Sequence, residues 1–70
     1  MRIAVTGATG VLGQEAVEAL VAAGHEVTGI TRRDSGVPIV EGRGGSAIVA
    51  DVFDPRDLTR AFREIGRAHV

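Results

Sequence analysis

The chain has 70 residues, of which 44% are hydrophobic, and its eight Lys and Arg residues against nine acids give a formal net charge of −1 at pH 7. This balance leaves no basic surface of the kind that binds nucleic acid, and no apolar run approaches the roughly 20 residues that span a bilayer. The chain does not start like a secretory signal and has no cysteine, so we expect one globular domain in the cytoplasm, with no nucleic-acid or membrane partner.

The first half of the chain predicts a strand, a helix and a second strand. Residues 2–6 (RIAVT) form a short run with β-branched side chains that ends at a glycine, as a buried parallel strand does. From residue 11 to residue 23, apolar side chains recur at helical spacing, and Gly24 can adopt the left-handed conformation that closes a helix. Residues 26–31 (EVTGIT) resume a strand pattern.

The second half predicts a loop, a strand and a helix. Five of residues 32–46 are Gly or Pro, which indicates a loop, and residues 47–50 (AIVA) are a third buried run. Asp54 then stands where it can cap a helix, with Pro55 at the first helical position and Asp57 in the first turn. This order of elements is that of a parallel α/β sheet.

Three glycines at a spacing of three separate the first predicted strand from the first helix, as the dinucleotide-binding fingerprint requires. Gly7 permits a tight turn, Gly10 leaves room for a pyrophosphate to approach the backbone, and Gly13 lets the helix pack closely on the sheet. At the helix N-terminus, the amides of Val11 and Leu12 can donate to a diphosphate without help from a lysine. The alternative is that these glycines only form a tight turn.

Three segments resemble the extended and atypical branches of the short-chain dehydrogenase/reductase superfamily, which are NAD(P)-dependent epimerases, dehydratases and reductases. TGATGVLG (6–13) is similar to their T-G-x-x-G-x-x-G motif, GHEVTGITRR (24–33) to their second strand and ADVFDPRDL (50–58) to the segment after their third strand. The resemblance implies the N-terminal half of a Rossmann fold, truncated, with three parallel strands and two helices. It also implies that Asp51 and Val52 hold the adenine, although Asp51 could instead cap a turn.

The choice between NAD and NADP depends on the end of the second strand. NAD-preferring relatives carry an acid there for the ribose 2′-hydroxyl, but this chain has Thr31, followed by Arg32 and Arg33. Guanidinium groups bind phosphate bidentately, so this pair favours NADP, unless it is a solvated pair partly neutralised by Asp34. The complete set of expected cofactor-binding residues is Gly7, Thr9, Gly10, Val11, Leu12, Gly13, Arg32, Arg33, Asp51 and Val52.

No catalytic or metal-binding residue is predicted. The family's catalytic Tyr-x-x-x-Lys lies downstream of its third strand, and this chain contains neither residue type. His25 lies away from other possible ligands and is interpreted as a surface residue, while residues 42–46 (GRGGS) indicate a flexible linker or, alternatively, an anion-binding nest. The chain is therefore either the front part of a longer enzyme with a small-molecule substrate or part of a non-catalytic dinucleotide-binding redox sensor.

The last seven residues, EIGRAHV, match the translation of a common short-read sequencing adapter. We therefore interpret residues 64–70 as a non-native tail and residues 1–63 as a partial NAD(P)-binding domain. The alternative is a natural helix end in which Gly66 is the C-cap.

Overall fold

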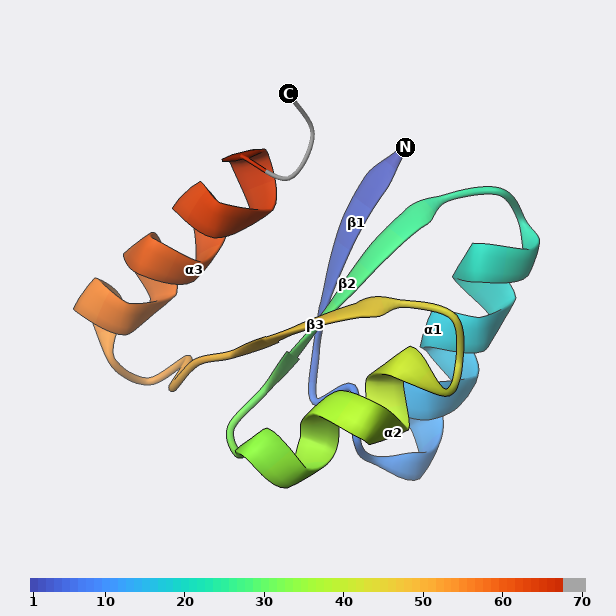
Figure 1. Ribbon diagram of the computed structural model, residues 1–70, viewed down its shortest axis with the longest axis horizontal. Coiled ribbons are helices and arrows are strands. Elements are labelled where there is room, and N and C mark those ends of the chain that lie inside the picture. The colour runs from blue at the N-terminus through green and yellow to red at the C-terminus, as the bar shows by residue number, and fades with distance from the viewer. Residues whose placement is uncertain (68–70) are drawn as a thin grey trace.

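The computed structural model describes the backbone of residues 1–67 and the side chains of residues 1–65. The elements follow one another along the chain as alternating strands and helices (Figure 1). They are β1 (Arg2–Thr6), α1 (Val11–Ala22), β2 (Glu26–Thr31), a 3-10 turn (Asp34–Gly36), α2 (Val37–Glu41), β3 (Ser46–Val49) and α3 (Pro55–Arg67). The predicted bounds of the first two strands and the predicted starts of α1 and α3 are confirmed, and β3 begins one residue earlier than predicted.

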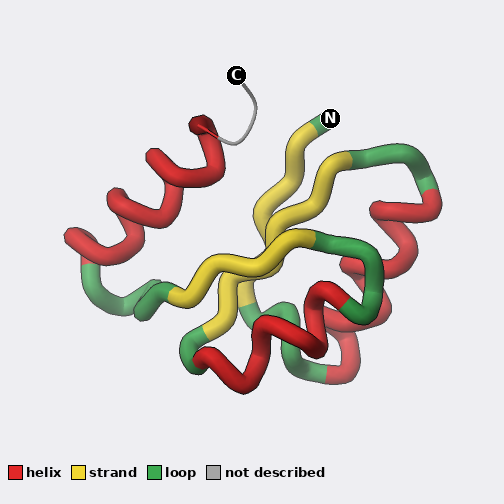
Figure 2. Tube along the Cα trace, in the orientation of Figure 1, coloured by secondary structure: helices red, strands yellow, loops and turns green. Residues whose placement is uncertain are grey.

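The three strands form one parallel sheet in the order β1-β2-β3 (Figure 2). In the register, Thr6 of β1 lies opposite Ile30 of β2, and Thr31 of β2 lies opposite Val49 of β3. Because all strands run in the same direction, their carboxyl ends meet at one edge of the sheet. This edge is where open α/β sheets bind their ligands.

The helices cover both faces of the sheet. Figure 1 shows α1 and α2 together on one side of the strands and α3 on the other. On the first face, Val17 of α1 and Val40 of α2 are fully buried with Val27 of β2. On the second face, Ala61 of α3 is buried against Ile30 of β2. Alternate residues of β2 therefore serve two separate apolar clusters, as expected for a sheet buried on both faces.

The prediction that residues 32–46 form a loop is wrong, because this segment contains the 3-10 turn and α2. Pro38 lies in the first turn of α2, where a helix does not need the amide hydrogen that proline lacks. Val40 is 0% exposed and anchors the short helix to the core. Residues 1–67 therefore contain three α-helices where two were predicted.

Residues 42–46 are neither a linker nor an anion nest. The amides of Gly42 and Gly44 donate to the carbonyl oxygens of Pro38 and Glu41, at 2.9 Å and 3.0 Å, and so close α2. Gly44 has a φ of +93°, a conformation that glycine adopts without steric cost. Because these amides are already used within the chain, they cannot converge on an anion.

Residues 64–67 continue α3, so Gly66 lies inside the helix and not after its end, as the C-cap alternative required. Ile65 packs against the cluster around Ile30, and Glu64 accepts a hydrogen bond from Arg60 at 2.9 Å. Residues 68–70 of the proposed tail lie outside the described residues. The origin of residues 64–70 stays a prediction.

Asp57 joins the start of α3 to the end of β3. Its Oδ2 accepts the backbone amide of Asp51 at 2.7 Å, and its Oδ1 accepts a hydrogen bond from Arg60 at 2.9 Å. Arg60 also donates to the carbonyl oxygen of Val49 at 2.8 Å. The hydrogen bond from the Asp51 amide, followed by that from Arg60, lowers the pKa of the Asp57 carboxyl below its usual value.

Replacing Asp57 by asparagine is expected to lower the melting temperature at neutral pH. A carboxyl whose pKa is lowered on folding stabilises the fold above its unfolded pKa of about 3.9, and this contribution is lost as the pH falls through the folded value. The difference between Asp57→Asn and the parent should therefore narrow below about pH 4. Thermal unfolding followed by circular dichroism between pH 7 and pH 3 checks this. Glu41→Gln, a change at an exposed acid, is the control, and a difference that does not vary with pH would contradict the account.

Candidate dinucleotide site

The turn between β1 and α1 needs glycine for two separate reasons. Gly7 has a φ of +64°, in the left-handed region, and its carbonyl oxygen accepts the amide of Gly10 at 3.1 Å. At Gly13 the reason is space, because a Cβ there would lie 2.0 Å from the carbonyl oxygen of Gly7. At Gly10 a Cβ would meet only that same oxygen at 3.5 Å, an ordinary contact. The conformation and packing of the turn therefore explain why residues 7 and 13 are glycine, but not why residue 10 is glycine.

The N-terminus of α1 has no acceptor of its own. Gly10 is the N-cap and supplies no side-chain hydrogen bond, and the first turn contains no acid. Val11 and Leu12 have exposed side chains, and their amides make no backbone hydrogen bond among the described residues. Amides of this kind, at the positive end of a helix dipole, form an anion-binding arrangement.

A side-chain network that was not predicted from the sequence holds the glycine-rich turn in place. Gln14 donates from Nε2 to the carbonyl oxygen of Thr9 at 2.7 Å. Arg43, which follows α2, donates to Oε1 of Gln14 at 3.2 Å and also pairs with Glu18. The two helices on this face are therefore connected to the backbone of the turn.

Two clefts open at the carboxyl ends of the strands. The first has a volume of about 320 Å³ and is lined by residues that include Gly7, Thr9, Arg32, Val52 and Phe53. The second, of about 260 Å³, is lined by residues that include Thr9, Arg32, Arg33 and Ser35. Arg32 and Thr9 belong to both, so the two clefts adjoin at the end of β2.

Thr31 holds the backbone of the basic pair that follows β2, Arg32 and Arg33. It is only 4% exposed, and its Oγ1 donates to the carbonyl oxygen of Arg33 at 2.9 Å and accepts the Arg33 amide at 3.3 Å. Arg32 and Arg33 are exposed and line the second cleft with the Ser35 hydroxyl, whereas Asp34 does not line it. The second cleft is therefore basic, with hydroxyl groups at its wall.

Asp51 has the turn-capping role that was the alternative in the sequence analysis. Its Oδ1 accepts the amide of Phe53 at 3.0 Å, and its own amide donates to Asp57. Val52 lines the first cleft, but Asp51 is not among the lining residues. A contact between Asp51 and adenine stays a prediction.

The structure brings half of the predicted cofactor-binding residues together at the carboxyl ends of the strands. Gly7, Thr9, Arg32, Arg33 and Val52 line the two clefts, whereas Gly10, Val11, Leu12, Gly13 and Asp51 are not among the lining residues. The lining residues outside the predicted set include Ser35 in the second cleft and Phe53 in the first. Ser35 could have been found from its place two positions after the arginines, but nothing in the sequence pattern marked Phe53.

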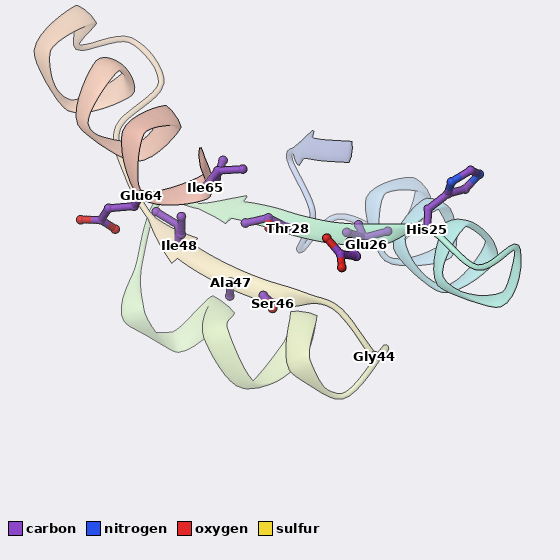
Figure 3. A pocket seen from close by; sticks show the side chains of 10 residues that line it. His25, Glu26, Thr28, Gly44, Ser46, Ala47, Ile48, Glu64 and Ile65 are labelled. Atoms are coloured by element: carbon purple, nitrogen blue, oxygen red, sulfur yellow. The ribbon is translucent and has the colours of Figure 1, made fainter. Parts of the chain in front are cut away.

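A third cleft, of about 610 Å³, lies at the opposite edge of the sheet, beside the amino ends of β2 and β3 (Figure 3). His25, which was interpreted as a surface residue, is half-buried at its rim. In Figure 3 the side chains of His25 and Glu64 lie at opposite ends of the cleft and do not converge on a common point. These two side chains therefore do not form a binding site together. The larger cleft is therefore not the candidate site.

Residues 1–67, the part of the chain that the structure describes, contain neither a candidate membrane-spanning helix nor a candidate metal-binding cluster. No helix there has the length and apolar character needed to cross a bilayer. Nor do three or more His, Cys, Asp or Glu residues come together there as a possible metal-binding group.

The glycine-rich turn, the uncapped helix N-terminus and the clefts at the carboxyl ends of parallel strands define a dinucleotide-binding protein of the Rossmann type. The chain belongs to the NAD dependent epimerase/dehydratase family, whose sequence model matches residues 3–70. This match confirms the resemblance to the extended branch of the short-chain dehydrogenase/reductase superfamily. Family membership implies a nicotinamide dinucleotide cofactor, and the open Gly10 and the uncapped amides of α1 fit its pyrophosphate.

Individual relatives agree with this assignment. The chain is 48% identical over 61 residues to L-arabinose 1-dehydrogenase (NAD(P)(+)) of Haloferax volcanii, and the match covers 87% of this chain and 21% of that protein. It is 36% identical over 69 residues to sterol demethylase protein B of Methylococcus capsulatus, covering 99% of this chain and 21% of that protein. The TT0495 protein from Thermus thermophilus has a similar structure, with a TM-score of 0.71 and 27% identity over 94% of this chain and 30% of that one. The chain thus spans about a fifth of the length of these curated relatives.

Proposed function

We propose that these residues form the dinucleotide-binding part of a larger, cytoplasmic NADP-dependent oxidoreductase or epimerase/dehydratase. The single observation that carries the cofactor preference is the basic cleft after β2, which holds Arg32, Arg33 and Ser35 and has no acid in its lining. The substrate would be a small molecule bound by parts of the protein beyond these residues. Similarity to a dehydrogenase and to a sterol demethylase protein supports the redox class.

The pyrophosphate is expected to lie against the first turn of α1. The amides of Val11 and Leu12 would donate to its oxygens, and Gly10 would let it approach the backbone closely. Gln14 has a positioning role, since it holds the carbonyl of Thr9 and so fixes the turn. When bound, the cofactor would supply hydride-transfer chemistry.

The 2′-phosphate of NADP is expected to enter the second cleft. Guanidinium groups donate bidentately to phosphate, and the hydroxyl of Ser35 adds a further donor. Thr31, whose hydroxyl is occupied by Arg33, offers no carboxylate that would repel a phosphate. In NAD-preferring members of the superfamily, this position carries the acid that binds the ribose 2′-hydroxyl.

Binding of NADP and NAD to the full-length protein tests this proposal. Because hydrogen bonds to charged groups contribute about 1.5–3 kcal/mol each, NADP should bind at least tenfold more tightly. Isothermal titration calorimetry at a fixed ionic strength gives both dissociation constants. Equal affinities would refute the NADP preference, and no binding of either dinucleotide would refute the proposed site.

A redox sensor that binds the dinucleotide without catalysis is the second candidate. The family's catalytic pair lies downstream of the third strand, so these residues are compatible with both candidates. The gene sequence after the codon for Arg63 separates the two candidates. A downstream Tyr-x-x-x-Lys favours the enzyme, and a longer protein that binds NADP but lacks this motif favours the sensor.

A further inference from the structure

Two hydrogen bonds hold a single peptide unit in the glycine-rich turn, the one that joins Thr9 to Gly10. Its carbonyl oxygen, on Thr9, accepts a hydrogen bond from Nε2 of Gln14 at 2.7 Å. Its amide, on Gly10, donates to the carbonyl oxygen of Gly7 at 3.1 Å. Because a peptide unit is planar, a rotation of this unit would break both hydrogen bonds at once. The unit directly precedes the first turn of α1, so its orientation affects the direction in which the first amides of that helix point.

The orientation of the Gln14 side-chain amide depends on Arg43. Nη2 of Arg43 donates to Oε1 of Gln14 at 3.2 Å, which leaves Nε2 on the side of Thr9. A guanidinium group only donates hydrogen bonds, and a carbonyl oxygen only accepts them. A reversed Gln14 amide would therefore place two donors against each other at Arg43 and two acceptors against each other at Thr9. Without the guanidinium, the first of these penalties disappears and the reversed form becomes more populated.

Arg43 is itself held by the core and by α1. It lies 29 residues after Gln14 in the chain, just beyond the end of α2. Its backbone amide donates to the carbonyl oxygen of Val40 at 3.0 Å, and Val40 is fully buried. Its guanidinium also pairs with Glu18 of α1. The packing of α2 in the core thus fixes the position from which Arg43 reaches the half-buried Gln14.

We propose that Arg43 is a positioning residue for the pyrophosphate site, and that it acts through Gln14 on the peptide unit between Thr9 and Gly10. This inference rests on the proposed function, because the pyrophosphate is the ligand that the turn is expected to bind. The apparent affinity of a ligand falls with the fraction of molecules whose site is in the competent conformation. By holding the Gln14 amide in one orientation, Arg43 keeps this fraction high in the free protein.

The test compares Arg43→Met, Gln14→Met and the double variant in the full-length protein. Methionine keeps an unbranched apolar side chain but donates no hydrogen bond. Arg63→Met is the matched control, because it makes the same change in charge at an exposed residue of α3 that does not line the described clefts. Amide hydrogen exchange at Gly10 and Ala23 is measured by NMR without ligand. The dissociation constant of NADP is measured at constant ionic strength.

Amide exchange at Gly10 should become about fivefold faster in both single variants, which is the factor that one hydrogen bond contributes to an equilibrium. The Ala23 amide, which donates to Ala19 at the other end of α1, should exchange as in the parent. NADP should bind about fivefold more weakly to each single variant. It should bind no more weakly to the double variant, because both substitutions remove the same arrangement. Arg63→Met should match the parent in every measurement.

An unchanged exchange rate at Gly10 in Arg43→Met would overturn the inference. Losses of affinity that multiply to about 25-fold in the double variant would also overturn it, since Arg43 and Gln14 would then act independently. Faster exchange at Ala23 would indicate a general loosening of α1, and an equal loss of affinity in Arg63→Met would indicate an effect of overall charge. Either result would contradict a positioning role. If the parent bound no NADP, the proposed function would fail, while the exchange rates would still show whether Arg43 orients the turn.

Discussion

Replacing Gly13 by alanine is expected to destabilise the protein by about 3 kcal/mol and to abolish dinucleotide binding. Glycine inside a helix normally costs about 1 kcal/mol relative to alanine, so propensity alone predicts stabilisation. The sign reverses here because the new Cβ would lie 2.0 Å from the carbonyl oxygen of Gly7 and 2.9 Å from the Cα of Ala8. Both atoms belong to the backbone, so no side-chain rotation relieves the clash and the turn must open. Denaturant unfolding and NADP titration measure the two losses.

Gly10→Ala is the matched comparison for this variant. Its Cβ would lie 3.5 Å from the oxygen of Gly7, and the φ of Gly10 is −71°, which any residue can adopt. The fold should therefore remain, while the added methyl group occupies the space that the pyrophosphate needs. If Gly10→Ala bound NADP like the parent, Gly10 would have no binding role. If Gly13→Ala were as stable as the parent, the described packing of α1 on β1 would be incorrect.

Arg32→Asp is expected to reverse the cofactor preference. In the parent, the guanidinium would pair with the 2′-phosphate of NADP, and a carboxylate in its place repels that phosphate but accepts a hydrogen bond from the 2′-hydroxyl of NAD. Loss of one or two charge-assisted hydrogen bonds predicts that NADP affinity falls at least tenfold. Titration of both dinucleotides at constant ionic strength gives the ratio of the dissociation constants for NADP and NAD.

The control for the charge change is Arg63→Asp, since Arg63 is an exposed residue of α3 that does not line the described clefts. It alters the net charge by the same amount and should leave the ratio of the two affinities unchanged. If Arg63→Asp lowered NADP affinity as much as Arg32→Asp, the effect would be one of overall charge. A ratio that stayed in favour of NADP in Arg32→Asp would show that Arg32 does not bind the 2′-phosphate.

The sequence was sufficient to predict the elements that have strong local signals. β1 and β2 are runs of β-branched residues that end at Gly7 and at the arginine pair, and Asp54 caps α3 through its Oδ1, which accepts the amide of Arg56 at 3.0 Å. α2 was missed because it has only five residues, too few for a helical period to show, and because Pro38 suggests a break. Its stability depends on the burial of Val40, which is a tertiary contact.

The part of the candidate site that lies within one continuous stretch of the chain could be predicted from the sequence. The three glycines and the first turn of α1 are consecutive, so their chemistry can be inferred from spacing. Phe53 was missed because its place in the first cleft depends on β2 and β3 lying side by side. Ser35 was missed because its place in the second cleft depends on Thr9, from the turn after β1, lying beside the residues that follow β2. The capping role of Asp51 depends likewise on its distance from Phe53 and Asp57.

The most direct test of the central claim is a crystal structure of the full-length protein with NADP bound. The account predicts pyrophosphate oxygens at about 2.9 Å from the amides of Val11 and Leu12, with the 2′-phosphate beside Arg32 in the second cleft. A dinucleotide bound instead in the cleft beside His25, at the amino ends of the strands, would contradict it.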